Sequence, residues 1–179
     1  MAEDKKEKWL NYLALTTVIF AVCATLSTFK GGSFSTRSVL SQAQASNQWA
    51  YYQAKSIKGY IYDIQREKIE LELRAAGKNM AKPVAEEYGK KIDDYSKRVK
   101  RYDEEKSKIE QDAKKLEKIR DDAQQHSRVF GMAVIFLQIA ILLSSIAALL
   151  KKKAVWIIGL LTGIVGIVYF ADGFFLIVK

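Results

Sequence analysis

Apolar residues in this chain gather into three long segments. Leu10–Phe29 and Val129–Leu150 contain no charged residue, and Ala154–Val178 contains only Asp172. These segments are 20, 22 and 25 residues long, whereas about 20 residues are needed for a helix to cross roughly 30 Å of hydrocarbon. Backbone polar groups must bond internally in hydrocarbon, which favours a helix in each segment. The pattern therefore predicts an all-α integral membrane protein with three transmembrane helices.

The remaining residues form a tail, a basic connection and one long charged insert. The tail is residues 1–9, and the connection between the second and third spans is residues 151–153. The insert, residues 30–128, has the pattern of two helical arms. They are expected at about 36–76 and 83–128.

Turn signals set the expected ends of these arms. Lys30-Gly31-Gly32-Ser33 predicts a break after the first span, because glycine is a poor helix former. The stretch from Gly77 to Pro83 predicts the turn between the arms, since glycine suits the end of a helix and proline suits a first turn. No stop signal precedes Val129, so we expect the second arm to continue into the second span. No segment has the alternating pattern of a strand.

Both arms carry apolar residues at alternating spacings of three and four, the seam of a coiled coil. Because a short link joins them, we expect a long extramembrane antiparallel coiled-coil hairpin. The expected seam of the second arm comprises Tyr88, Ile92, Tyr95, Val99, Tyr102, Lys106, Ile109, Ala113 and Leu116. The expected seam of the first arm comprises Val39, Ala43, Ser46, Ala50, Gln53, Ile57, Tyr60, Ile64 and Leu71.

The first arm is polar but uncharged from Ser38 to Gln53. Gln42, Ser46 and Gln53 represent its amide and hydroxyl side chains, and small residues separate them. Such residues allow close helix approach with little hydrophobic drive. Either this face packs against a neighbouring copy of the chain, or it is an ordinary solvated helix face.

The basic composition does not indicate nucleic-acid binding. The formal net charge is +9, but residues 30–128 hold 22 Lys/Arg and 16 Asp/Glu, a net of +6, with the two signs interleaved. Interleaved charges are typical of a solvated helix face rather than a phosphate-binding stripe. We therefore expect the partners to be a lipid bilayer and protein, with no nucleic acid.

No set of residues in the sequence suggests catalysis, a cofactor or a metal ion. Cys23 is the single cysteine and His126 the single histidine. Metal sites and acyl-transfer sites both need several converging groups. Cys23 is interpreted as a packing residue and His126 as an interfacial polar residue, and the chain is predicted not to be an enzyme.

Charge asymmetry predicts an orientation. Lysines precede the first span, and Lys151, Lys152 and Lys153 form the whole connection between the second and third spans. Short lysine-rich segments remain in the cytoplasm, and three spans place these two segments on the same side. Trp9 and Trp156 lie beside them, as interfacial anchors do. The hairpin is then expected outside the inner membrane.

Two features of the third span are candidate sites. Gly159, Gly163 and Gly166 share one helix face, and small residues at this spacing let membrane helices pack closely within or between protomers. Asp172 is the one ionisable residue within a span. It is either an interfacial residue near the chain end or part of an ion or proton path.

Several stretches together resemble a bacterial membrane family known as domain of unknown function 4337. They are Trp9 to Val18, Phe29 to Gly32, Ser35 to Gln42, Gln48 to Lys58, Gly131 to Gln138 and Phe170 to Phe174. The resemblance covers nearly the whole chain. It implies a bacterial inner-membrane protein and brings no activity, cofactor or site residues.

The leading functional hypothesis is a non-enzymatic, oligomeric membrane scaffold built on the hairpin. The alternative is an oligomeric pore, with the uncharged face of residues 38–53 along a path and Asp172 near a mouth. An adaptor for an unidentified membrane or periplasmic protein is a further possibility if the chain does not self-associate. An enzyme is the least supported reading.

Overall fold

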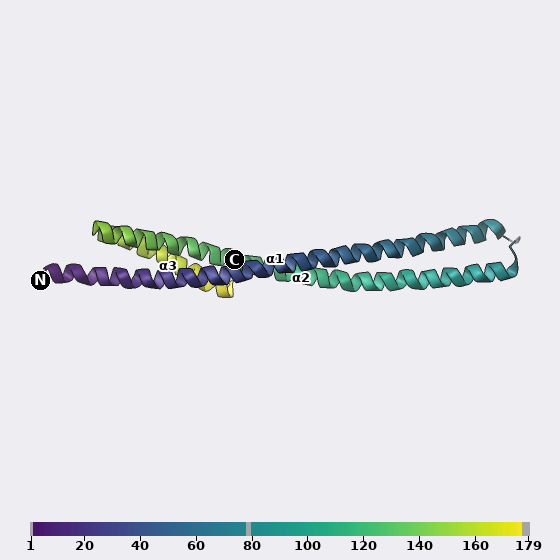
Figure 1. The fold of residues 1–179 in the computed structure, drawn as a ribbon, viewed down its shortest axis with the longest axis horizontal. Coiled ribbons are helices and arrows are strands. Elements are labelled where there is room, and N and C mark those ends of the chain that lie inside the picture. Colours follow the sequence, from purple (N-terminus) through teal and green to yellow (C-terminus); the bar gives the residue numbers. More distant parts are fainter. Residues whose placement is uncertain (1, 78–79, 177–179) are drawn as a thin grey trace. The chain divides into compact units, whose positions relative to one another are not determined.

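The computed structural model describes residues 2–77 and 80–176, with side chains from residue 8 onward, and these residues form three helices (Figure 1). Helix α1 spans Ala2–Ala76, α2 spans Lys82–Leu150 and α3 spans Lys153–Phe175. No strand occurs within the described ranges. The all-α fold expected from the sequence is confirmed.

The expected break after the first apolar segment is wrong. Helix α1 continues through Gly31 and Gly32, so the tail, the first apolar segment and the first arm form one helix. Gly31 lies against α2, where an added Cβ would come within 3.1 Å of the Phe130 Cβ. Two glycines in a helix cost about 1 kcal/mol each, and we infer that this close approach offsets part of that cost.

The ends of the arms lie close to the predicted turn. Helix α1 stops at Ala76, and Gly77 has a φ of 53°, which glycine adopts without a steric penalty. Helix α2 begins at Lys82, one residue before the expected Pro83. The Ala81 carbonyl accepts bonds from the backbone N–H groups of Val84 and Ala85. From there α2 runs unbroken to Leu150, as expected.

The third helix is shorter than the predicted 154–178. It begins at Lys153, after Lys151 turns the chain with a φ of 51°. It ends at Phe175, where Leu176 adopts a left-handed conformation and donates its backbone N–H to the Asp172 carbonyl at 2.7 Å. Residues 177 and 178 lie outside the described part of the chain.

Contacts divide the chain into two compact units. We call residues 1–40 together with 119–179 the three-helix unit, and residues 41–118 the two-helix unit. Parts of α1 and α2 belong to each unit, and all of α3 belongs to the first.

The core of the three-helix unit is made of alanine, leucine and aromatic residues. In the middle, Phe20 of α1 packs with Leu137 and Ala140 of α2, and side chains of α3 cover them. At one end, Trp9 and Leu13 pack with Ala147 and with the start of α3. Helix α2 therefore runs opposite to both α1 and α3, and α1 and α3 run in the same direction.

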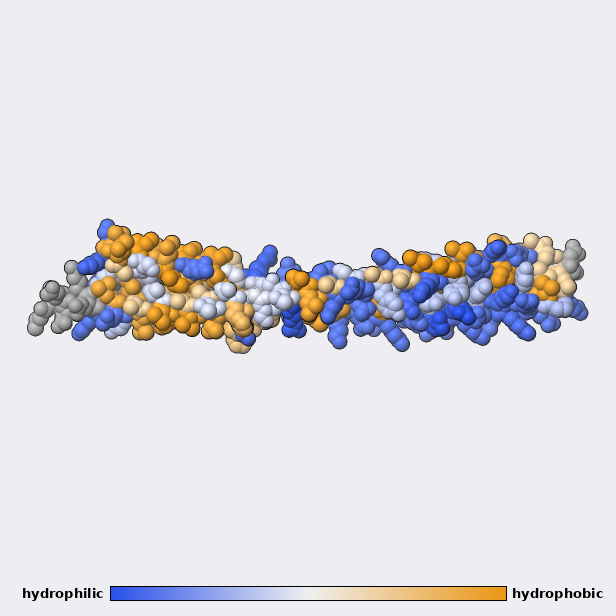
Figure 2. All heavy atoms as spheres, in the orientation of Figure 1, coloured by the Kyte–Doolittle hydropathy of each residue, from blue (hydrophilic) through white to orange (hydrophobic). Residues whose placement is uncertain are grey.

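Each of the three helices contains a segment long and apolar enough to cross a membrane. The outer surface of the three-helix unit is correspondingly hydrophobic: Val18 is 60% exposed and Leu149 is 83% exposed. Figure 2 shows hydrophobic residues over most of the visible surface of this part of the chain. Apolar surface on this scale is unusual for a protein in water.

In the two-helix unit, α1 and α2 lie antiparallel. Trp49 donates its indole N–H to Glu117 at 2.9 Å, Lys55 bonds Glu105 at 2.6 Å, and the Tyr88 hydroxyl bonds Glu72 at 3.2 Å. As the α1 number rises, the α2 number falls, so the two segments pair in opposite directions.

The structure uses the predicted seam of α2 but not that of α1. On α2, Tyr102, Ile109 and Ala113 are buried, and the other seam residues are half-buried. On α1, every residue of the predicted seam is exposed, including Ile57 and Ile64. A different face of α1 meets α2, comprising among others Ser41, Ala45, Trp49, Tyr52, Gly59, Tyr62 and Arg66.

The sizes of the facing side chains explain why this face of α1 meets α2. Tyr102 of α2 packs over Gly59 of α1, where an added Cβ would lie 3.6 Å from the Tyr102 Cβ, an ordinary van der Waals distance. The Tyr102 ring also stacks on Tyr62 with ring centroids 5.9 Å apart. Large side chains therefore pack against small ones, and the aliphatic face of α1 turns outward.

Candidate functional site

The three glycines predicted as a packing face contact helices of the same chain. An added Cβ on Gly159 would lie 3.3 Å from the Ala140 carbonyl, and one on Gly166 would lie 2.7 Å from the Leu137 side chain. Gly163 faces α1 instead, with the Phe20 ring directly against it. The glycine face of α3 is therefore occupied within one protomer.

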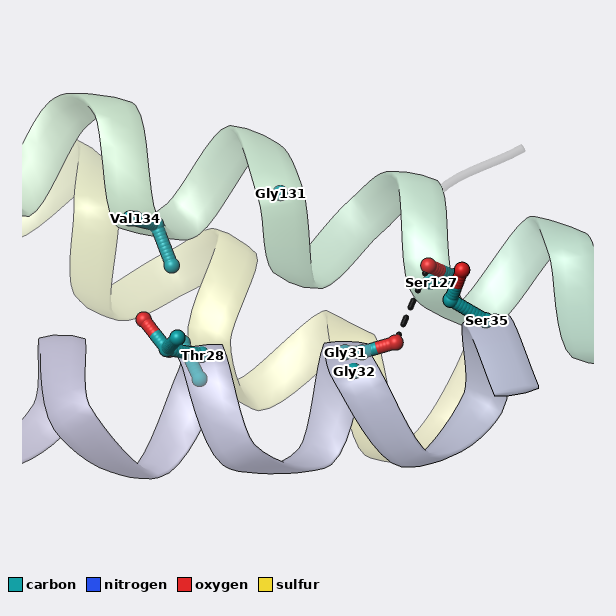
Figure 3. A pocket seen from close by; sticks show the side chains of 8 residues that line it. Thr28, Gly31, Gly32, Ser35, Ser127, Gly131 and Val134 are labelled. Carbon is teal, nitrogen blue, oxygen red and sulfur yellow. Dashed lines mark hydrogen bonds between the residues drawn. The ribbon is translucent and has the colours of Figure 1, made fainter. Parts of the chain in front are cut away.

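A shallow groove runs between α1 and α2 in the three-helix unit, and we call it the glycine groove (Figure 3). Its volume is about 270 Å³. Small and hydroxyl residues line it: Ser27, Thr28, Gly31, Gly32, Ser35, Ser127, Gly131 and Val134. An added Cβ on Gly32 or Gly131 would meet no atom within 4 Å.

The hydroxyl groups of this groove bond to the backbone. The Ser127 hydroxyl donates to the Gly31 carbonyl at 3.0 Å, the dashed line in Figure 3. Ser27 and Thr28 donate to carbonyls four residues earlier on α1, at 2.8 and 2.9 Å. These hydroxyls therefore stabilise helix backbone and helix contact, and none is paired with a base as a nucleophile would be.

A histidine–aromatic junction lies beside the groove. Because the Gly173 carbonyl only accepts, the Nδ1 of His126 donates to it, at 2.8 Å. The ring of Phe34 stacks on the imidazole with centroids 4.4 Å apart, and Phe130 lies 6.0 Å from Phe34. Residues of all three helices thus meet here, and their contacts hold α3 against α1 and α2.

Asp172 lies at this end of α3 and is 5% exposed. Its own carbonyl receives the Leu176 N–H, and the next residue, Gly173, packs against the Phe130 ring. A buried position beside a helix end differs from a solvated interfacial position, which is one of the two alternatives that the sequence leaves open.

The polar residues proposed for an interface lie on the two-helix unit. Gln42, Ser46 and Gln53 are all exposed, and the Gln42 amide donates to the Ser46 hydroxyl at 3.2 Å. They share one exposed face of α1, within about 40° of arc at 100° per residue. We call this the outer face of α1. It comprises Gln42, Ala43, Ser46, Ala50, Gln53, Ile57, Ile61, Ile64 and Leu71.

The opposite, inner face of α1 carries ionic and aromatic contacts. Lys55 bonds Glu105 at 2.6 Å and lies over the rings of Tyr51 and Tyr102 at 5.2 and 5.4 Å. The hydrogen bond to Lys55 lowers the pKa of Glu105, and the same bond raises the pKa of Lys55. This pair holds α1 and α2 together. Both pKa shifts move away from neutral pH, whereas a catalytic acid or base needs a pKa close to it.

Within the described residues, no group of three or more His, Cys, Asp or Glu is placed to hold a metal ion. The arrangement instead supplies two surfaces for contact, the glycine groove and the outer face of α1. The sequence pattern assigned residues of the outer face to the seam with α2, and for residues 38–53 it also left open a contact with a neighbouring copy or a solvated face. It missed the junction at Phe34 and Phe130.

A usable signal for the junction was the spacing of aromatic residues. His126 and Phe130 are four residues apart, as are Phe170 and Phe174, and such pairs share a helix face. The two phenylalanine rings of α3 pack edge to face at 5.3 Å. The spacing could not predict that Phe34 stacks on His126. Phe34 follows Gly31 and Gly32, where the sequence predicted the end of a helix.

Comparisons with known proteins identify a family. No curated protein and no solved structure matches the chain. A family model, described as domain of unknown function (DUF4337), matches residues 9–176, which include all the contacts described above in the three-helix unit and the whole two-helix unit. The chain therefore belongs to the DUF4337 family.

Proposed function

We propose that this protein is an integral membrane scaffold, without enzymatic activity, that self-associates through the outer face of α1. Three segments are long and apolar enough to cross a membrane, and the surface of the three-helix unit is hydrophobic. Hydrocarbon solvates such a surface without cost, whereas water does not. The bilayer is therefore the first partner in this proposal.

The proposed location is the bacterial inner membrane. The N-terminus and residues 151–153 lie in the cytoplasm, and residues 41–118 lie in the periplasm. Lysine-rich short segments support this orientation. At the same end, Trp156 donates to the Thr16 hydroxyl at 3.3 Å, and its ring lies 6.1 Å from that of Trp9. A tryptophan pair is typical of a membrane–water interface.

The two-helix unit is proposed to be a coiled-coil hairpin that presents an interface. The half-buried and buried seam of α2 supports the coiled coil. The observation that carries self-association is the uncharged part of the outer face: residues 38–53 contain no charge, and Ser46, Ala50 and Gln53 are exposed. Small residues let two helices approach closely, and exposed amides supply hydrogen bonds between them.

The pore alternative has less support. A path for ions needs polar groups that face an opening, whereas Asp172 is 5% exposed in a single protomer. The scaffold needs only the exposed face that α1 already presents.

Native mass tests the proposal. The wild-type protein in nanodiscs or mild detergent is expected to have the mass of an oligomer, by light scattering or native mass spectrometry. Ala50→Glu places a charge in the small face and is expected to shift the mass toward the monomer. Asn47→Glu adds the same charge at an exposed position of α1 beside the outer face and is expected to leave the mass unchanged. A monomeric wild type would refute the scaffold.

A further inference from the structure

Four large aliphatic residues stand unpaired on the outer face of α1. Ile57, Ile61, Ile64 and Leu71 are 60%, 52%, 62% and 63% exposed. They lie on the side of α1 opposite Tyr62, which packs on α2. We call these four residues the aliphatic stripe. Apolar side chains left in water are favoured to be buried, so the stripe favours a covering partner.

The spacing of the stripe fits another helix. Its members follow one another at four, three and seven residues, the a and d positions of a heptad. A stripe this narrow fits one facing helix, whereas a helix lying on lipid presents a broader apolar face with basic borders. The borders here include Asp63 and Glu72 as well as Lys58. Acidic borders disfavour an anionic lipid surface.

The charges within the stripe are self-complementary. The gap between Ile64 and Leu71 is filled by Glu67 and Lys68, which are both exposed. In this register Ile57, Ile64 and Leu71 occupy d and Ile61 occupies a, so Lys68 is at the next a position and Glu67 at the g position before it. In a parallel coiled coil, a residue at position a packs into a hole that includes position g of the other helix. Lys68 at a then meets the partner's Glu67 at g, and the symmetric contact repeats on the other side. Within its own helix Lys68 lies 4.0 Å from Glu72, and an identical chain adds a second glutamate beside it. A single lysine at an a position specifies the register of a coiled coil.

We propose that a second copy of this chain docks on the aliphatic stripe, with the two α1 helices parallel and in register. The inference rests on the proposed function, because copies inserted in one membrane with one orientation run their α1 helices in the same direction. A two-fold axis then sets Ile64 against the partner's Ile64, and likewise each other member of the stripe. In each copy, α2 lies on the side away from this contact.

Cysteine cross-linking tests the register. Cys23→Ala removes the single native cysteine, and Ile64→Cys is then introduced and oxidised with copper phenanthroline in native membranes. Two cysteines form a disulfide only when their Cα atoms lie within about 7 Å, so Ile64→Cys is expected to give a covalent dimer. The control Gln65→Cys is exposed on the adjoining side of α1. It is expected to give several-fold less dimer.

The outcomes separate the inference from the function. If the wild type is an oligomer but Ile64→Cys cross-links no better than Gln65→Cys, the stripe is not the contact and the scaffold stands. If the wild type is a monomer, both the scaffold function and the contact between two copies at the aliphatic stripe are refuted. Ile64→Glu, at an exposed position that does not disturb the fold, is expected to lower the native mass. Unchanged mass in that variant overturns the inference without reference to oxidation.

Discussion

At the scale of single residues, the glycines fall into two groups with opposite roles. Gly163 and Gly173 touch buried aromatic rings, so an added methyl group would overlap Phe20 or Phe130. Gly32 and Gly131 face open space in the glycine groove. The first group allows helices to approach closely, whereas the second costs helix propensity without any contact in the single protomer.

These two groups predict opposite effects of alanine. Gly163→Ala forces the buried Phe20 ring to move and is expected to destabilise the three-helix unit by about 1–3 kcal/mol, as overpacking does. Gly131→Ala meets no atom and is expected to be neutral or to stabilise by up to about 1 kcal/mol. Thermal unfolding in mild detergent, followed by circular dichroism, measures both. A Gly163→Ala variant that melts at or above the wild-type temperature would contradict the packing described here.

The sequence predicted the packing face formed by the α3 glycines, but it did not predict every residue that the glycines of the chain contact. The shared face of Gly159, Gly163 and Gly166 follows from spacing alone. The helix break expected at Gly31 and Gly32 failed because propensity is a local quantity, and a glycine that admits Phe130 is favoured by contact with a distant segment. Phe34 was missed for the same reason.

At the scale of elements, the pairing of α1 with α2 depends on which face each presents. Periodicity located the seam of α2, where the bulky residues are the tyrosines. It assigned the wrong face of α1, because the heptad rule considers whether residues are apolar and does not consider whether a facing side chain fits against them. Gly59 has no hydrophobic side chain, yet it is buried beside Tyr102, while Ile57 is exposed.

The ion pair between these helices predicts a dependence on pH. Lys55 holds the folded-state pKa of Glu105 below the unfolded value of about 4.3. The contribution of the pair is therefore present above that value and is lost as pH falls through the lower folded pKa. Glu105→Gln is expected to lower the melting temperature at neutral pH and to have little effect near pH 2. A difference between wild type and variant that persists undiminished in acid would contradict this assignment.

A neighbouring glutamate provides the control. Glu104→Gln changes the same charge on an exposed side of α2, so it is expected to leave the melting temperature nearly unchanged at both pH values. The raised pKa of Lys55 sets the high-pH limit of the stability that the ion pair contributes. Its contribution is complete below the unfolded pKa of about 10.4 and is lost as pH rises through the folded value.

At the scale of the whole molecule, the proposed orientation makes residues 41–118 accessible from only one side of the membrane. With Cys23→Ala as background, Gln65→Cys is expected to react with a membrane-impermeant maleimide in intact bacterial cells whose outer membrane has been permeabilised. Lys152→Cys, in the basic connection, is expected to react only after the inner membrane is opened. The physical cause is the retention of lysine-rich short segments in the cytoplasm. The reverse labelling pattern would invert the topology, and because every copy would be inverted together, the parallel pairing of α1 helices would still stand.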